Sequence, residues 1–407
     1  MLLDRRTLLY AGSSGLALTA LGCATTPAPP DRFTSLRGFT KDAQPLTPTH
    51  HAQHLARAQK RIGEAGLSAL VVEAGRTLWY LSGVAWRPSE RPFLLVVPAE
   101  GRPKWIAPAF EALRAKESIG AADAELLLWQ EDEDPYALAK KAMGEGRVAV
   151  EPRTRDFIVR GIEDALGRQL EDGSAIVRGL RMIKSDAELA LMERANLATK
   201  AALEVAMANT RVGMTEGQMK SIVTDAQRAA GLVNVWALVL FGENAAFPHG
   251  TGQERSLADG DFVLIDTGGQ LHGYCSDITR TWPCGKPSDE AARALDTVLA
   301  AQDAAFEVLK PGAACEDADA AARKVITDAG FGEDYTAFTH RLGHGIGLDG
   351  HEAPYLVRGN KTVLRPGMTM SNEPGIYRPG AYGVRIEDIL VITNDGYRVF
   401  GERAQRR

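Results

Sequence analysis

Residues 261–278 read DFVLIDTGGQLHGYCSDI and suggest a β-hairpin that carries two acids. The apolar run before Asp266 predicts a buried strand, Thr267–Gln270 is expected to turn, and a return strand is expected from Gly273. The hairpin would place Asp266 and Asp277 opposite each other on neighbouring strands. Two buried, opposed carboxylates repel unless a cation lies between them. This stretch therefore predicts an antiparallel sheet and indicates a metal ion.

Three later segments supply further groups of the same chemistry. The segment 339–347, THRLGHGIG, alternates glycine from Gly343 onward, which argues against a helix and for backbone pressed closely around His344. Glu373 ends a predicted strand in the segment 368–375, MTMSNEPG. In the strand 383–390, GVRIEDIL, alternation puts Arg385 and Glu387 on one face. Each acid or histidine alone is weak evidence, so the prediction depends on the set.

Taken together, these segments resemble the pita-bread metallopeptidases, in the branch of prolidase and aminopeptidase P. The phrases GYCSDITRTW, HRLGHGIGLDGHEAPYL and SNEPGIY carry the resemblance, which covers roughly residues 55–400. It implies an α/β N-terminal domain and an α+β pita-bread C-terminal domain, whose antiparallel sheet carries a dinuclear metal site. The five residues that match the family's metal ligands in order and spacing are Asp266, Asp277, His344, Glu373 and Glu387.

The donor set and its charge favour two metal ions. Four carboxylates and one imidazole form an oxygen-rich set that suits Mn²⁺, Co²⁺ or Zn²⁺, and we expect Mn²⁺. Two divalent cations balance the four negative charges, whereas one ion leaves the pocket strongly negative. His351-Glu352 has no second histidine at the spacing of an HExxH helix, so a single-zinc protease site of that type is excluded.

The resemblance also implies catalytic roles. Glu373 would accept a proton from the attacking water, which the two metals activate, in addition to its role as a ligand. His249, in the sequence FPHG, matches the family histidine that stabilises the tetrahedral intermediate. His351 matches a histidine near the scissile carbonyl oxygen and the leaving nitrogen.

Two further residues are assigned to the substrate pocket by resemblance. His340 matches a substrate-pocket histidine, and Arg385 would orient Glu387 and neighbouring groups. Leu271 stands where many relatives carry tyrosine, so we expect substrate hydrogen bonding to differ. His272 lies in the expected hairpin turn and matches no family motif, so we expect it to be structural.

The implied reaction is hydrolysis of Xaa-Pro peptide bonds in proline-containing di- or oligopeptides. A dipeptidase is preferred to an aminopeptidase that acts on longer peptides, because the N-terminal domain is single and short. A creatinase-like C–N hydrolase and a non-enzymatic binding protein are the alternatives from other classes. Both typically lack part of the ligand set, which is complete here. Relatives are often dimers through the N-terminal domain, so a homodimer is expected.

Patterning predicts two domains, at 50–180 and 184–402. In the first, apolar runs alternate with helical stretches, as in an α/β domain. The expected strands are Ser68–Val72, Pro92–Val97, Glu125–Trp129 and Arg147–Val150, and the expected helices include Ala52–Ala65 and Tyr136–Met143. In the second, Ser185 and Thr215 have the spacing of helix-capping boxes. His50, His51 and His54 are expected at an exposed helix start and not in a metal site, because no carboxylate or cysteine completes the set.

The remaining features concern composition and the N-terminus. The 407 residues carry a net charge of −5, and the basic residues are scattered, which argues against nucleic acid as a partner. Residues 1–30 resemble an export signal with paired arginines, followed by a proline-rich tether. Cys23 ends a lipoprotein-like box, although cleavage after Gly22 also fits. We therefore expect a bacterial protein that is periplasmic or anchored in the membrane through Cys23.

Overall fold

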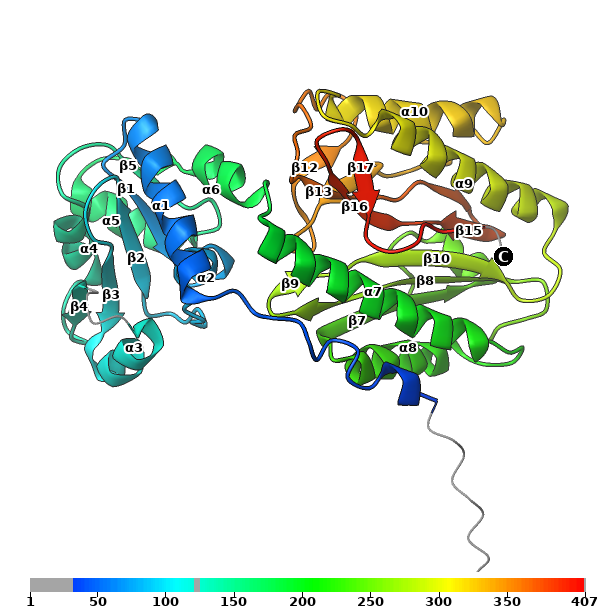
Figure 1. Ribbon diagram of the computed structural model, residues 1–407, viewed down its shortest axis with the longest axis horizontal. Helices are drawn as coiled ribbons and strands as arrows, with labels where there is room; N and C mark the ends of the chain where they lie inside the picture. The colour runs from blue at the N-terminus through cyan, green and yellow to red at the C-terminus, as the bar shows by residue number, and fades with distance from the viewer. Residues whose placement is uncertain (1–31, 121–124, 406–407) are drawn as a thin grey trace, which may run out of the picture.

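The computed structural model describes residues 32–120 and 125–405, which form two domains side by side (Figure 1). The predicted export signal and tether at 1–30, with Cys23, lie outside the described residues. Within the described ranges, no helix combines the length and the apolar character that a membrane crossing requires.

The N-terminal domain is a six-stranded mixed sheet in the order β4-β3-β2-β1-β5-β6, with helices on both faces (Figure 1). Its strands are β1 (Ala69–Glu73), β2 (Leu94–Pro98), β3 (Lys104–Pro108), β4 (Glu125–Trp129), β5 (Val148–Val150) and β6 (Glu171–Asp172). Its helices are α1 (Pro48–Glu64), α2 (Arg76–Ser82), α3 (Ala112–Ile119), α4 (Pro135–Met143), α5 (Asp156–Leu166) and α6 (Ser174–Arg181). All five residues of β1 are buried, because alternate side chains face the helices on opposite sides.

Most of the elements predicted for this domain are present. The strand Glu125–Trp129 is confirmed, and the other three strands are shifted by one or two residues. Helix α1 begins four residues before the predicted start, because Thr47 caps it and Pro48 occupies the first turn, where a missing N–H costs nothing. Strand β3 was not predicted.

The C-terminal domain consists of two main sheets with helices packed against them (Figure 1). The first sheet contains β7 (Val233–Phe241), β8 (Phe262–Leu271), β9 (Tyr274–Cys275) and β10 (Ile278–Pro283), next to α7 (Asp186–Ala208) and α8 (Glu216–Ala230). The second sheet has the order β12 (Glu352–Leu356), β11 (Gly343–Gly345), β13 (Thr369–Asn372), β16 (Asp388–Ile392) and β17 (Tyr397–Val399).

Helices α9 (Asp289–Val308) and α10 (Cys315–Asp328) share a hydrophobic core with the second sheet. A separate ribbon pairs β14 (Gly375–Arg378) with β15 (Tyr382–Arg385). The predicted capping boxes are confirmed at Ser185, which precedes α7, and at Thr215, which precedes α8. Short 3₁₀ helices occur at η1 (Thr34–Leu36), η2 (Ala109–Glu111) and η3 (Gly242–Ala246).

The hairpin forms, but the predicted turn at Thr267–Gln270 is wrong. Strand β8 continues to Leu271, and the chain reverses at His272 and Gly273, with φ of 48° and 91°. His272 thus lies in the turn, as predicted, and is exposed. The preceding glycines serve close packing: a Cβ on Gly268 would lie 2.0 Å from the Ser276 carbonyl oxygen. Glycine marked close backbone approach here and not a turn.

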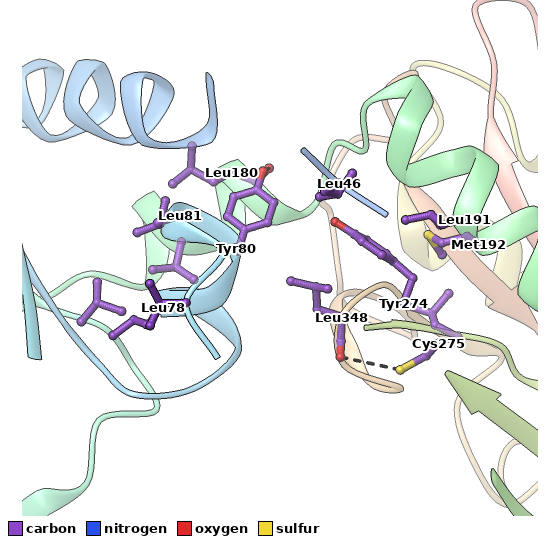
Figure 2. Close-up of a cluster of buried hydrophobic side chains, with 14 of the residues drawn as sticks. Leu46, Leu78, Tyr80, Leu81, Leu180, Leu191, Met192, Tyr274, Cys275 and Leu348 are labelled. Atoms are coloured by element: carbon purple, nitrogen blue, oxygen red, sulfur yellow. Dashed lines mark hydrogen bonds between the residues drawn. The ribbon is translucent and has the colours of Figure 1, made fainter. Parts of the chain in front are cut away.

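One buried apolar cluster crosses the boundary between the domains. Figure 2 shows ten of its labelled residues, Leu46, Leu78, Tyr80, Leu81, Leu180, Leu191, Met192, Tyr274, Cys275 and Leu348. His51 and His54 lie beside this cluster and are only 6% and 2% exposed, so the predicted exposed position of these two histidines is wrong. The Nδ1 atoms of His51 and His54 lie 3.1 and 2.9 Å from the Tyr80 carbonyl oxygen. Trp79 and Tyr80 of α2 pack against the two rings, and Glu188 of α7 lies 3.7 Å from His54 Nε2.

Candidate metal centre

All five predicted ligand residues line one cavity of about 570 Å³ between the two sheets of the C-terminal domain. Asp266 lies on β8, and its register partner on β10 is Thr279. Asp277 lies in the irregular step between β9 and β10. His344 is the central residue of β11, which pairs with β13, and Glu373 follows β13 directly. Glu387 stands immediately before β16.

The side chains of these residues converge within the cavity. His344 Nε2 lies 3.2 Å from Glu373 Oε1 and 3.8 Å from Asp277 Oδ2. Within the described part of the chain, three groups place one ligand atom of each member within 4.8 Å of the others. They are Asp266, Asp277 and Glu387; His344, Glu373 and Glu387; and Asp277, His344 and His351. Shared members join the three groups into one continuous centre.

Three carboxylate oxygens in this centre are buried without a hydrogen-bond partner: Asp266 Oδ1, Asp277 Oδ1 and Glu387 Oε1. Such atoms are costly unless something else satisfies them. Burial, together with the neighbouring carboxylates, raises the pKa of Asp277 and of Glu387 well above the usual range. Two divalent cations would supply the missing charge and bind the unpaired oxygens, so the residues fit the expected metals.

Glu373 differs from Asp277 and Glu387 in the direction of its pKa shift. Burial alone would raise its pKa, but the His344 hydrogen bond and charge, with smaller contributions from His340 and Arg385, bring the pKa to about 2. The Ser371 hydroxyl also donates to Glu373 Oε1 at 3.0 Å. A carboxylate held in this way can bind a cation and can still accept a proton.

Arg385 is buried and forms an ion pair with one of these acids, Asp266. It donates from Nη2 to Asp266 Oδ2 at 2.6 Å and from Nη1 to the Tyr377 hydroxyl at 2.9 Å. Its Nε donates to Thr279 Oγ1, which in turn donates to Glu387 Oε2 at 2.8 Å. Arg385 therefore contacts Asp266 directly and reaches Glu387 only through Thr279. Sequence reasoning missed Thr279 and Tyr377, although a period of two puts Thr279 on the same face as Asp277. The predicted pairing of Asp266 with Asp277 is wrong, because the register of β8 and β10 pairs Asp266 with Thr279.

The predicted histidines differ in whether their ring nitrogens are available to bind a ligand. Both ring nitrogens of His340 are engaged, Nδ1 with the Arg341 carbonyl at 2.8 Å and Nε2 with the Tyr377 hydroxyl at 2.7 Å. Burial lowers the pKa of His340 to about 4, so the ring is neutral. His249 lines the cavity from the exposed loop after η3.

His351 lies beside the metal-ligand set. Its ring stands 3.8 Å from that of His344, centroid to centroid. Desolvation and the charges of His344 and Arg341 lower its pKa to about 4. Leu271, by contrast, packs in the interdomain cluster. It is five residues from Asp266 on β8 and thus on the opposite face, so its lack of a hydroxyl does not alter the cavity wall.

Comparison with known proteins agrees with this architecture. The model of metallopeptidase family M24 matches residues 190–394, and that of the creatinase/prolidase N-terminal domain matches residues 54–183. The chain is 39% identical over 360 residues to the probable dipeptidase PepE of Mycobacterium tuberculosis, covering 85% of this chain and 93% of that protein.

Two solved structures are similar to nearly the whole fold. The dipeptidase PepE from Mycobacterium ulcerans has a TM-score of 0.85 at 36% identity, covering 89% of this chain and 98% of that one. The prolidase from Thermococcus sibiricus has a TM-score of 0.79 at 30% identity, covering 88% and 98%. The architecture is thus the two-domain pita-bread fold of the prolidase structures.

Proposed function

Since the chain belongs to metallopeptidase family M24 and is an enzyme, we propose that it is an exported Xaa-Pro dipeptidase that binds two divalent cations, Mn²⁺ foremost. The observation that carries the metal proposal is the convergence of four acids and one imidazole, with three buried oxygens left unpaired. Asp266, Asp277, His344, Glu373 and Glu387 would hold the ions. Such ions polarise a peptide carbonyl and make water a stronger nucleophile at neutral pH.

The chain's own residues would then orient the substrate and move its protons. Glu373, ionised and at the cavity wall, would accept the proton of the attacking water. His351 and His249 line the same cavity and would contact the scissile carbonyl and the developing tetrahedral centre. Arg385 would fix the orientation of Asp266, and the engaged ring of His340 would form a neutral wall for the substrate side chain.

A cation at the cavity favours a dipeptide over a longer peptide. Arg341 lines the cavity and is exposed, and its guanidinium stacks over the Tyr355 ring at 4.5 Å. Among the described residues, no carboxylate forms an ion pair with it. The C-terminal carboxylate of a dipeptide, which lies on its second residue, would bind this guanidinium, because arginine binds carboxylates in a bidentate fashion. Longer peptides carry no charge at that position.

The decisive experiment compares four substrates with the purified, Mn²⁺-loaded protein: Ala-Pro, Ala-Pro amide, Ala-Pro-Ala and Ala-Ala. Mass spectrometry of the products should show cleavage of Ala-Pro above the other three. Preference for Ala-Pro-Ala would make the enzyme an aminopeptidase, and equal cleavage of Ala-Ala would remove the proline specificity. Failure to cleave any of the four with Mn²⁺, Co²⁺ or Zn²⁺ would contradict the peptidase proposal and favour another substrate.

Export and assembly are separate parts of the proposal. The paired arginines and the box ending at Cys23 support export to the periplasm, with lipid attachment at that cysteine. Fractionation of cells expressing the full chain or Cys23→Ala tests this: the variant should move from the membrane to the soluble periplasmic fraction. Light scattering of the purified protein should give the mass of a homodimer.

A further inference from the structure

The loop between β11 and β12, residues 346–351, carries His351. The N-terminal domain forms ion pairs with residues on both sides of that histidine. Asp349 stands two residues before it and Glu352 one residue after it. Arg181, the last residue of α6, donates from Nη2 to Asp349 Oδ2 and to Glu352 Oε2, each at 2.5 Å. One guanidinium from the neighbouring domain thus bridges both ends of the segment that presents His351.

Two further cations complete this ion-pair cluster, which we call the clamp. Arg153, in the loop after β5, lies 2.8 Å from Asp349 Oδ1, and Lys184, in the linker before α7, lies 2.7 Å from Glu352 Oε1. The side chains of Arg181 and Lys184 are 8% and 1% exposed, so water screens these pairs little. Within the clamp, every carboxylate has more than one cationic partner.

Apolar packing and backbone hydrogen bonds hold the same loop. Leu348 is buried in the interdomain cluster of Figure 2, and its carbonyl accepts from Cys275 Sγ at 3.6 Å. The Cys275 backbone N–H donates to the Gly347 carbonyl at 2.8 Å. These contacts anchor the loop before Asp349. His351 itself lies in no helix or strand, and it is flanked by the clamp residue Asp349 and by Glu352, which also begins β12 and pairs with Gly345.

We infer that Arg181 is a positioning residue, through which the N-terminal domain holds His351 against the metal centre. The inference rests on the proposed function, in which His351 contacts the substrate. Without the guanidinium, the buried Glu352 and the partly buried Asp349 lose their shared partner, and the loop relaxes away from Arg181. A displacement of about 1 Å at a reacting group costs on the order of 10²-fold in rate. The N-terminal domain thereby contributes to catalysis by positioning His351, although none of its own residues contacts the substrate.

A double-mutant cycle on Ala-Pro hydrolysis tests this inference. Arg181→Met should lower kcat by about 10-fold to 10²-fold in the native background, and by less than about 2-fold in a His351→Asn background, because the effect passes through that ring. Arg181→Lys should recover part of kcat. Arg178→Met, on the exposed side of the same helix, is the matched control and should leave kcat unchanged. Metal content, measured for every variant, should not change.

Hydrogen exchange gives a readout that does not depend on activity. Amides of residues 347–352 should exchange faster in Arg181→Met, while those of β8 stay protected. Equal losses of kcat in both backgrounds, or unchanged exchange in the loop, would overturn the inference. If Arg181→Met does not fold, Arg153→Met replaces it in the double-mutant cycle with His351→Asn. This variant removes an exposed cationic partner of Asp349. A native protein that cleaves no peptide defeats the proposed function, and the exchange measurement still decides whether Arg181 fixes the loop.

Discussion

Two clusters of acids, one in the metal centre and one in the clamp, differ in how far cationic side chains of the protein balance their negative charge. In the centre, Arg385 forms an ion pair with only one of the four carboxylates, Asp266, and three carboxylate oxygens have no partner. In the clamp, Asp349 and Glu352 face three cations, and burial is compensated within the chain. A cluster that is complete without a ligand stabilises the fold, whereas one that is incomplete indicates what must bind.

The largest expected effect follows from changing one acid of the centre. Asp277→Asn should reduce Ala-Pro hydrolysis by at least about 10³-fold, because a bound ion contributes several kcal/mol to the transition state. The metal-free variant should nevertheless melt above metal-free native protein, since one unpaired buried charge is gone. Activity assays, metal analysis and thermal melting measure these changes, with exposed Asp328→Asn as the control. Retained activity in Asp277→Asn would remove this residue from the ligand set.

Removal of the metal should be the next largest effect. A ligand present at 1,000 times its Kd stabilises a folded protein by about 4 kcal/mol, so chelation should lower the Tm by several degrees. Differential scanning calorimetry with and without chelator, followed by Mn²⁺ readdition, measures the shift. Equal melting temperatures in both states would mean that the centre does not need a cation.

The clamp predicts a stability effect without any ligand. Lys184→Met leaves Glu352 with one cation instead of two and should lower the unfolding free energy by about 3 kcal/mol, at the low end for a broken buried pair. Lys324→Met removes an exposed partner of Asp328 and should cost less than about 1 kcal/mol. Urea unfolding of both variants gives the comparison. Similar costs would show that the clamp is no stronger than a surface pair.

The smallest expected effect concerns pH and the domain interface. Burial lowers the pKa of His54 below its usual 6.5, although its hydrogen bond to Tyr80 and the charge of Glu188 act in the other direction. The unfolded chain therefore binds the proton more readily, and stability should fall as pH drops below about 6.5. His54→Phe keeps the stacking on Tyr80 and should show a weaker decline. Thermal melting of the metal-loaded proteins between pH 7.5 and 5.5 compares them, and identical declines would exclude His54 as the source.

Local patterns predicted what depends on neighbours in sequence. The strand Glu125–Trp129 and the capping boxes at Ser185 and Thr215 follow from side-chain alternation and from hydrogen bonds three residues apart. The turn at Thr267–Gln270 was wrong because glycine permits both a turn and close packing, and only the neighbouring Ser276 backbone distinguishes the two. The exposure of His51 and His54 was wrong because Trp79 and Tyr80 of α2 pack against both rings and Glu188 of the second domain lies beside His54.

The sequence by itself determined the donor set: four acids, one imidazole and their order along the chain, from which the resemblance implied a metal centre. Only the tertiary structure decided which oxygens stay unpaired, that Arg385 contacts Asp266 directly, and that Tyr377 engages His340. It also decided that Arg181, from the other domain, reaches the loop of His351. The physical reason is that ligand type is a property of single residues, whereas charge compensation depends on distances between segments that only packing sets.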